Sequence, residues 1–285
     1  MTASWDESVE QLEITLGAYT FDAYAAGPQE GELVLLLHGF PEFADCWGAA
    51  LTELAAAGYR AVAVDQRGYS PRARPAEVSA YHVDALVEDV LGFADALGAR
   101  RFHLLAHDWG GLVAWAAAAR HPERIRTLSV LATPHPGALQ EALRGATDQA
   151  ERSKYVQLFQ APGHKAEQVL LAEGGEPLRG VYQGAVAQEL VEDNLRRLAA
   201  GALTGGLNWY RAVPGTFETE VAPVTVPTLY VWGTEDMALG PDAAALTAKY
   251  VEAAYHFLPL DGATHWLPEA DAERYLPAVL AHLAR

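Results

Sequence analysis

The sequence has very little cysteine and comparatively few basic residues. Cys46 is the only cysteine among 285 residues, so no disulfide can form within the chain and a reducing compartment is the simplest expectation. Acidic residues (37) outnumber lysine and arginine (20), which gives a formal net charge of −17. Because nucleic acids and anionic membranes attract basic surfaces, we expect neither as a partner.

The sequence also shows no pattern typical of a targeting segment or a membrane-spanning helix. Residues 1–13 are acidic and lack the basic and apolar regions of a signal peptide. No apolar run approaches the roughly 18 residues of a transmembrane helix. We therefore expect a cytoplasmic protein. The chain is rich in apolar side chains, at 51% of all residues, which is enough for a large buried core and favours neutral, apolar substrates.

Short strand-like runs alternate with helical stretches in the first half of the chain. The runs lie at 12–16, 19–24, 33–37, 59–64, 101–106 and 125–131. The first two look like an antiparallel pair, and the others alternate with helices, as in a parallel sheet with crossover connections. Asp45 and Ser79 are the predicted N-caps of the first two helices.

The alternation stops between residues 135 and 220. This segment shows helical patterns at 141–149, 166–172, 181–186 and 188–200, and no buried strand. Strand-like runs resume at 228–232 and 255–259. The sequence therefore predicts an α/β fold with a mostly parallel central sheet flanked by helices. Residues 1–134 and 221–285 form the two parts of the core, and 135–220 form an inserted helical cap.

A turn with the spacing of a nucleophile elbow follows the run at 101–106. Asp108 occupies the place where esterases carry serine, between Ala106 on one side and Gly110 and Gly111 on the other. A serine that attacks a saturated carbon would form an ether, whereas a carboxylate forms an ester that activated water can hydrolyse. Asp108 is thus a candidate nucleophile for displacement at saturated carbon, although an aspartate here could also cap the helix.

Two further residues complete a catalytic triad in the expected chain order. His265 follows the last strand and is the candidate base that activates water. Asp236 follows the penultimate strand and is the candidate acid that orients this histidine. Glu235 is its rival. The order nucleophile, acid, base is that of hydrolases with a nucleophile elbow.

An oxyanion hole is predicted from two backbone N–H groups. Residues 38–41 (His-Gly-Phe-Pro) end the strand at 33–37, where this architecture supplies one donor. The N–H of Phe40 and that of Trp109 would face the oxyanion that develops on the ester carbonyl.

With these pieces the sequence resembles the epoxide hydrolases of the α/β-hydrolase superfamily. The resemblance spans nearly the whole chain and rests on HGFPE at 38–42, DQRGYS at 65–70, HDWGG at 107–111, WGTED at 232–236 and THW at 264–266. Haloalkane dehalogenases share the fold and the aspartate nucleophile, so the core motifs alone do not separate the two activities.

The predicted cap favours the epoxide hydrolases. That family uses two cap tyrosines to hydrogen-bond the epoxide oxygen, and phenols keep their protons at neutral pH. Tyr155 and Tyr210 stand in segments that look like the family's two tyrosine segments. A dehalogenase instead needs N–H donors for the halide, for which Trp109 keeps this alternative open, with Trp209 as a weaker second donor.

The resemblance implies a hydrolase that adds water to an apolar epoxide and releases a vicinal diol. The expected substrate contacts are His38, Pro41, Trp109, Trp209 and Trp266. The resemblance implies no organic cofactor and no metal, and the expected partners are a small hydrophobic epoxide and water, with a homo-oligomer left open. A haloalkane dehalogenase and a non-catalytic binding protein on the same fold remain the alternatives.

Overall fold

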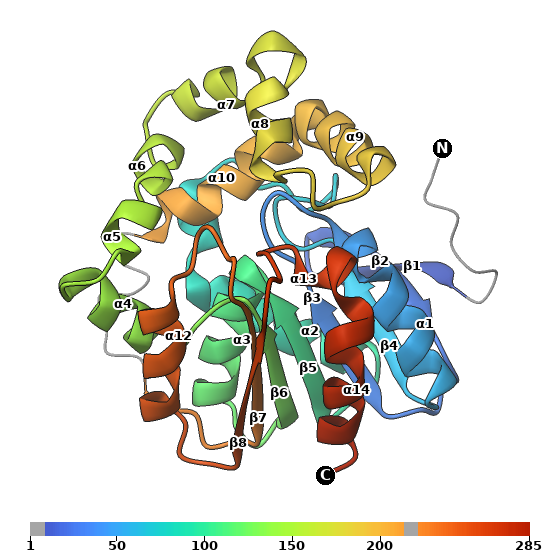
Figure 1. The fold of residues 1–285 in the computed structure, drawn as a ribbon. Coiled ribbons are helices and arrows are strands. Elements are labelled where there is room, and N and C mark those ends of the chain that lie inside the picture. Colours follow the sequence, from blue (N-terminus) through green and yellow to red (C-terminus); the bar gives the residue numbers. More distant parts are fainter. Residues whose placement is uncertain (1–8, 214–221) are drawn as a thin grey trace.

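A twisted sheet of eight strands forms the centre of the molecule. The computed structural model describes residues 9–213 and 222–285. The strands lie in the order β1-β2-β4-β3-β5-β6-β7-β8 across the sheet (Figure 1). They are β1 (Glu10–Leu16), β2 (Tyr19–Ala26), β3 (Leu33–Leu37), β4 (Arg60–Val64), β5 (Phe102–His107), β6 (Ile125–Leu131), β7 (Thr228–Gly233) and β8 (Tyr255–Leu260).

The sheet is mostly parallel, as predicted. Strand β2 pairs antiparallel with both β1 and β4, and every other neighbouring pair is parallel. Every residue of β3, β5 and β7 is buried, and β3 is accordingly an unbroken apolar run. Because the carboxyl ends of parallel strands lie at one edge, the loops after β3, β5, β7 and β8 converge there.

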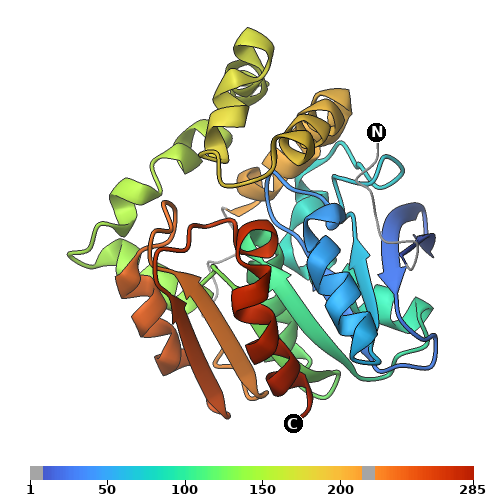
Figure 2. The same ribbon diagram turned by 45° about the vertical axis from the view of Figure 1, so that its right-hand side comes forward.

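Helices cover both faces of this sheet. One core cluster joins the sheet to α1 (Gly48–Ala56) and α14 (Ala272–Leu283), and another joins it to α2 (Val83–Ala96) and α3 (Asp108–Arg120). Figure 2 shows α1 and α14 together on one face. The remaining core helices are α12 (Pro241–Leu246) and α13 (Leu267–Ala270), with short 3-10 turns at η1 (Ala44–Trp47), η2 (Val78–Tyr81) and η5 (Thr247–Tyr250).

A layer of helices lies over the carboxyl edge of the sheet, between β6 and β7 in the chain (Figures 1 and 2). We call these helices the cap. They are α4 (Pro136–Arg144), α5 (Gln149–Arg152), α6 (Tyr155–Phe159), α7 (Lys165–Leu170), α8 (Glu176–Val181), α9 (Gln188–Arg197) and α10 (Leu203–Arg211), with short turns η3 (Ala172–Gly174) and η4 (Leu198–Ala202). The predicted domain boundaries stay predictions, and the boundary at 220 lies outside the described residues.

Helix α10 is seated directly on the core. A Cβ atom on Gly205 would lie 2.2 Å from the carbonyl oxygen of Gly68, so only glycine permits this approach. The indole N–H of Trp209 donates to the carbonyl of Arg67 at 2.8 Å. These contacts fix the last helix of the cap against the loop after β4.

Two predicted helix caps are wrong. Asp45 lies inside η1, and the residue before that turn is Phe43. The carboxylate of Asp45 forms an ion pair with Arg197 of the cap. This long-range contact outweighs local capping. Ser79 lies inside η2, and α2 begins only at Val83 without a side-chain cap. Among the described residues, no helix is both long and apolar enough to cross a membrane.

Candidate active site

Asp108 occupies a strained turn between β5 and α3. Its φ angle is +48°, a region that non-glycine residues seldom adopt. The turn is possible because its neighbours are small: a Cβ atom on Gly110 would lie 2.4 Å from the carbonyl oxygen of Leu37. Thr133, which the sequence analysis did not single out, donates its hydroxyl to the Asp108 carbonyl at 2.8 Å. The strand-turn-helix context predicted for the nucleophile elbow is therefore present.

Three predicted triad residues come together at the carboxyl edge of the sheet. Nδ1 of His265 lies 2.8 Å from Oδ2 of Asp236. The other oxygen of Asp236 accepts the backbone N–H groups of Ala238 and Leu239 at 2.8 and 3.0 Å. Nε2 of His265 lies 3.6 Å from Oδ2 of Asp108. The rival acid, Glu235, is exposed.

The charges of these groups support one another. Burial opposes the charged form of His265, but the carboxylates of Asp236 and Asp108 raise its pKa well above the usual value. Burial also opposes ionisation of Asp108, yet His265, His107 and the Phe40 N–H lower the pKa of this carboxyl below its ordinary value. The side chain of Asp108 is therefore a carboxylate at neutral pH.

The backbone around Asp108 offers hydrogen-bond donors. The N–H of Phe40 donates to Oδ1 of Asp108 at 2.9 Å. Trp109 is the second residue of α3, and the N–H groups in the first turn of a helix have no partner within that helix. Both groups stand where the sequence predicts an oxyanion hole.

The two predicted cap tyrosines lie close to Asp108. Tyr155 begins α6 and Tyr210 lies in α10, with ring centroids 6.3 Å apart. The ring of Tyr210 packs edge-on against that of Trp109, with ring centroids 4.7 Å apart. Burial and the nearby charge of Asp108 raise the pKa of Tyr155. Burial and the charges of Tyr155 and Asp108 raise that of Tyr210. Both phenols are protonated at neutral pH.

These groups line one cavity of about 420 Å³ between the cap and the sheet. Asp108, Trp109, Tyr155 and Tyr210 contribute to its wall. The rest of the wall is mainly apolar and includes Leu112, Pro136, Leu139, Leu143, Val156, Val213, Ala238 and Leu239. A neutral, apolar molecule of modest size fits such a cavity.

Four of the expected substrate contacts lie away from the cavity wall. His38 is buried and is hydrogen-bonded to Gly39 and Gln66. The carbonyl of Pro41, which follows a cis peptide bond, accepts the Tyr182 hydroxyl. Trp209 packs edge-on against Trp109 at 5.9 Å, and Trp266 packs against the ring of His265 at 5.1 Å. The structure thus places these side chains behind the residues that face the cavity.

A buried network that the sequence analysis did not assign supports the base histidine. Nδ1 of His107 lies 2.9 Å from Glu42, and Nε2 lies 2.9 Å from the carbonyl oxygen of His265. Burial opposes the charge of Glu42, but His107 and Glu269 lower its pKa. Glu42 and His107 stand within the motifs HGFPE and HDWGG, so their position beside predicted site residues could have indicated them. No cluster of metal-ligating side chains occurs among residues 9–213 and 222–285.

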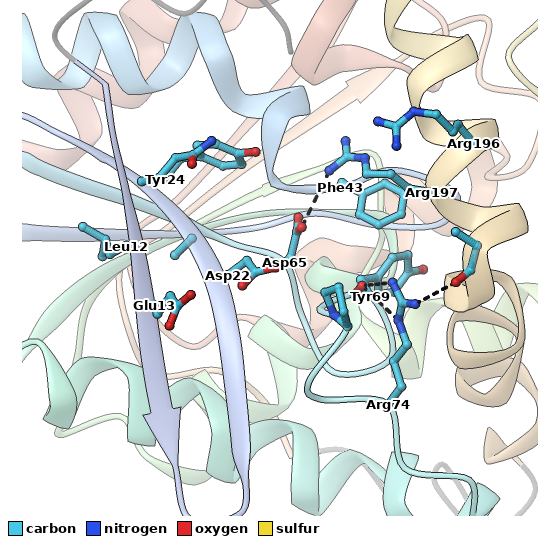
Figure 3. Close-up of a pocket in the computed structure, with 14 residues that line it drawn as sticks. Leu12, Glu13, Asp22, Tyr24, Phe43, Asp65, Tyr69, Arg74, Arg196 and Arg197 are labelled. Atoms are coloured by element: carbon cyan, nitrogen blue, oxygen red, sulfur yellow. Dashed lines mark hydrogen bonds and ion pairs between the residues drawn. The ribbon is translucent and has the colours of Figure 1, made fainter. Parts of the chain in front are cut away.

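A second cleft, of about 680 Å³, lies where α9 of the cap meets β1, β2 and the loop after β4. Figure 3 shows its charged lining, in which Arg197 forms an ion pair with Asp65. The guanidinium of Arg74 donates hydrogen bonds to the backbone carbonyls of Tyr69 and Ala200. The guanidinium of Arg197 lies 3.8 Å from the centre of the Phe43 ring. This cleft contains none of the predicted catalytic side chains. Its ion pairs join the cap to the core.

Comparison with known proteins agrees with this geometry. A model of the alpha/beta hydrolase fold matches residues 32–269. The chain is 34% identical over 260 residues to epoxide hydrolase 4 of Mus musculus, covering 87% of this chain and 72% of the relative. It is 33% identical over 262 residues to an AB hydrolase superfamily protein, YfhM, of Bacillus subtilis (strain 168), covering 89% of this chain and 91% of the relative.

Solved structures are similar over an even larger share of the chain. The crystal structure of Bacillus megaterium epoxide hydrolase in complex with an inhibitor superposes with a TM-score of 0.86 at 25% identity. The match covers 96% of this chain and all of the other, 100%. The cap and the core are therefore both found in that protein. This chain belongs to the alpha/beta-hydrolase fold family and is similar over most of its length to members named epoxide hydrolase.

Proposed function

We propose that this protein is an epoxide hydrolase that converts an apolar epoxide into a vicinal diol through an ester on Asp108. The main observation behind this proposal is that two phenols of the cap and the Asp108 carboxylate line the same apolar cavity. A carboxylate can attack an epoxide carbon while phenols hydrogen-bond the oxygen that leaves. The epoxide hydrolases among its relatives support this assignment.

In the first step, Asp108 attacks one ring carbon and the bond from that carbon to the epoxide oxygen breaks. The developing alkoxide accepts hydrogen bonds from Tyr155 and Tyr210 and takes a proton from one of them. Because both phenols hold their protons at neutral pH, they are ready to donate when the alkoxide forms. The product of this step is an alkyl ester of Asp108 with a neighbouring hydroxyl group.

In the second step, His265 activates water against that ester. Esterification removes the negative charge of Asp108, one of the two carboxylates that raise the pKa of His265. The ring can then become neutral, passing its proton back toward the deprotonated phenol, and accept a proton from water. Hydroxide adds to the ester carbonyl, and the N–H groups of Phe40 and Trp109 stabilise the oxyanion. The acyl C–O bond then breaks, and the leaving alkoxide takes up the proton of the added hydroxyl group, so that the diol leaves and Asp108 is a carboxylate again.

The environment of Trp109 favours an epoxide over a haloalkane. An indole has a single N–H donor, and the Trp109 ring packs edge-on against that of Tyr210, with ring centroids 4.7 Å apart. A halide would need this donor to be directed at the leaving group. An epoxide oxygen instead needs an acid, which the two tyrosines supply.

The assignment is tested by a single turnover of an aryl epoxide in heavy-oxygen water, with enzyme in excess. We expect the first diol to carry an oxygen from Asp108 and the solvent label to appear in the peptide that contains Asp108. Asp108→Ala is the control, in which neither diol nor labelled peptide should form. A first-turnover diol that carries the solvent label would mean direct attack by water. Halide release from bromoalkanes, without epoxide turnover, would assign the protein as a dehalogenase.

A further inference from the structure

The loop that carries Asp236 is held by a short helix of the cap. We call residues 236–240 the acid loop. Gln149, the first residue of α5, is almost fully buried against it, at 1% exposure. Its Nε2 donates to the carbonyl of Ala238 at 2.8 Å, and its Oε1 accepts the N–H of Gly240 at 2.8 Å. One side chain of the cap therefore binds the acid loop at two points.

Arg152 adds a third contact at the acid itself. Its Nη1 donates to the backbone carbonyl of Asp236 at 2.6 Å. Its Nε donates to Asp148 at 2.8 Å, which fixes the orientation of the guanidinium. A charged donor on a carbonyl forms a stronger hydrogen bond than a neutral one does. The cap thus holds the main chain at Asp236 as well as at the far end of the loop.

The same backbone orients the carboxylate of Asp236. The N–H groups of Ala238 and Leu239 bind one carboxylate oxygen, which leaves the other for Nδ1 of His265. Gln149 holds the carbonyl of Ala238 and the N–H of Gly240 on either side of Leu239. A rotation of these peptide groups would also turn the donors that aim Asp236 at the histidine.

We propose that Gln149 and Arg152 are positioning residues that make ester hydrolysis depend on the seating of the cap. The proposal rests on the proposed function, because it assigns these residues to the His265-dependent second step. Opening of the epoxide requires Asp108 and the two phenols, which the acid loop does not hold. Hydrolysis of the ester requires His265 to be aligned by Asp236, and this alignment is set from α5.

The test uses Gln149→Leu and Arg152→Met in the full-length enzyme, with Glu151→Gln as a matched control on the same helix. The side chain of Glu151 is 71% exposed and pairs with Lys154 instead of the acid loop. Rapid quenching with enzyme in excess measures epoxide loss and diol formation separately, and intact mass measures the alkyl-enzyme. We expect epoxide loss to stay within about twofold, while diol formation slows about 10- to 100-fold and alkyl-enzyme accumulates.

Two further readouts separate positioning from a general loss of structure. The pH dependence of diol formation should shift to lower pH, because a poorly aligned Asp236 raises the pKa of His265 less. Arg152→Lys should restore part of the second step, since lysine keeps a charged donor. Equal slowing of both steps, or an unshifted pH profile, would overturn the proposal.

The proposal also has a test that needs no turnover. In the ligand-free enzyme, the proton on Nδ1 of His265 reports its hydrogen bond to Asp236 by a downfield NMR resonance. This resonance should move or exchange faster in Gln149→Leu and remain unchanged in Glu151→Gln. An unchanged resonance in Gln149→Leu would refute the positioning role. If the enzyme does not turn over epoxides, the proposed function fails, whereas this measurement still tests the contact between cap and acid loop.

Discussion

His265 and Asp108 are neighbours without being hydrogen-bonded: Nε2 of the ring lies 3.6 Å from the nearer carboxylate oxygen, Oδ2. Oδ1 is the oxygen that accepts the Phe40 N–H. This separation suits a ring that acts on water instead of on the nucleophile. The carboxylate needs no base, because its pKa is already lowered. The two chemical steps therefore depend on different partners, and substitutions should separate them.

Asp236→Asn should impair the second step alone. An amide would present N–H groups to Nδ1 of His265 and favour the wrong tautomer of the ring. We expect diol formation to slow by ~10²- to 10⁴-fold and alkyl-enzyme to accumulate, as measured by rapid quenching and intact mass. Glu235→Gln, at the exposed neighbouring position, is the control. If Glu235→Gln has the larger effect, the assignment of the acid is wrong.

Tyr155→Phe combined with Tyr210→Phe should impair the first step. Loss of both proton donors leaves the alkoxide without an acid, and epoxide loss in a single turnover should slow by about 10²- to 10⁴-fold. Tyr255→Phe is the matched control, because this hydroxyl is buried in the core at the start of β8, where it has no hydrogen-bond partner within the described residues. Undiminished ring opening in the double variant would remove both tyrosines from the mechanism.

Arg197→Met should destabilise the contact between cap and core. Its guanidinium faces the buried carboxylates of Asp45 and Asp65, which the variant leaves unpaired. We expect the free energy of unfolding in urea to fall by about 2–4 kcal/mol at pH 8. Adding Asp65→Asn should recover part of the loss. A double variant no more stable than Arg197→Met would show that Asp65 is not the group left unpaired.

The loss in Arg197→Met should also depend on pH. Burial raises the pKa of Asp65 to about 7 in the folded protein, whereas an unfolded chain has the ordinary value near 4. Between about pH 4 and pH 7 the folded state therefore holds more protons than the unfolded chain. The cost of ionising Asp65, which lowers the stability of the folded state, grows as pH rises through this range. Without Arg197 that cost increases, so the destabilisation should be smaller at pH 5 than at pH 8.

His282→Gln should reveal a contribution to stability that is lost in acid. His282 is buried beside the carbonyls of Leu128 and Pro227, and burial lowers its pKa to about 4. The folded state thus keeps the ring neutral, while the unfolded chain takes up a proton near pH 6.5. The contribution is present above pH 6.5 and is lost as pH falls toward 4.

Glutamine does not titrate and can donate to the same carbonyls, which makes this variant a suitable reference for the histidine. The difference in unfolding free energy between wild type and His282→Gln should decrease by roughly 1–3 kcal/mol from pH 7.5 to pH 4.5. Urea titrations at several pH values provide the measurement. A difference that does not change with pH would contradict the assignment of this titration to His282.

Much of the site was predictable because it stands at strand ends. Asp108, Asp236 and His265 each follow an apolar run, and parallel strands bring such positions together whatever the loops between them do. Phe40 follows the same logic. The roles of these residues in catalysis stay predictions until the experiments above are done, but their proximity in space is now observed.

The cap was harder to predict from local pattern. The predicted helix at 141–149 instead begins at Pro136 and ends at Arg144, residues 182–186 do not continue a helix, and α10 was missed. Glycines at 201, 205 and 206 weaken the helical pattern of the last segment, and the contact of Gly205 with Gly68 is a tertiary reason for them. The local sequence did not indicate a role for Gln149, since its hydrogen-bond partners lie about ninety residues away in the chain.

The seating of α10 also determines from which side the site can be reached. Tyr210 is carried by a helix whose backbone touches the core, and this residue is only 4% exposed. Tyr155 is 37% exposed, and Leu143 beside it is 40% exposed. We therefore expect a substrate to enter past Tyr155, with its bulky substituent on that side when the ring reaches Asp108. The anchored helix thus orients the two ring carbons unequally, so one regioisomer of attack should predominate.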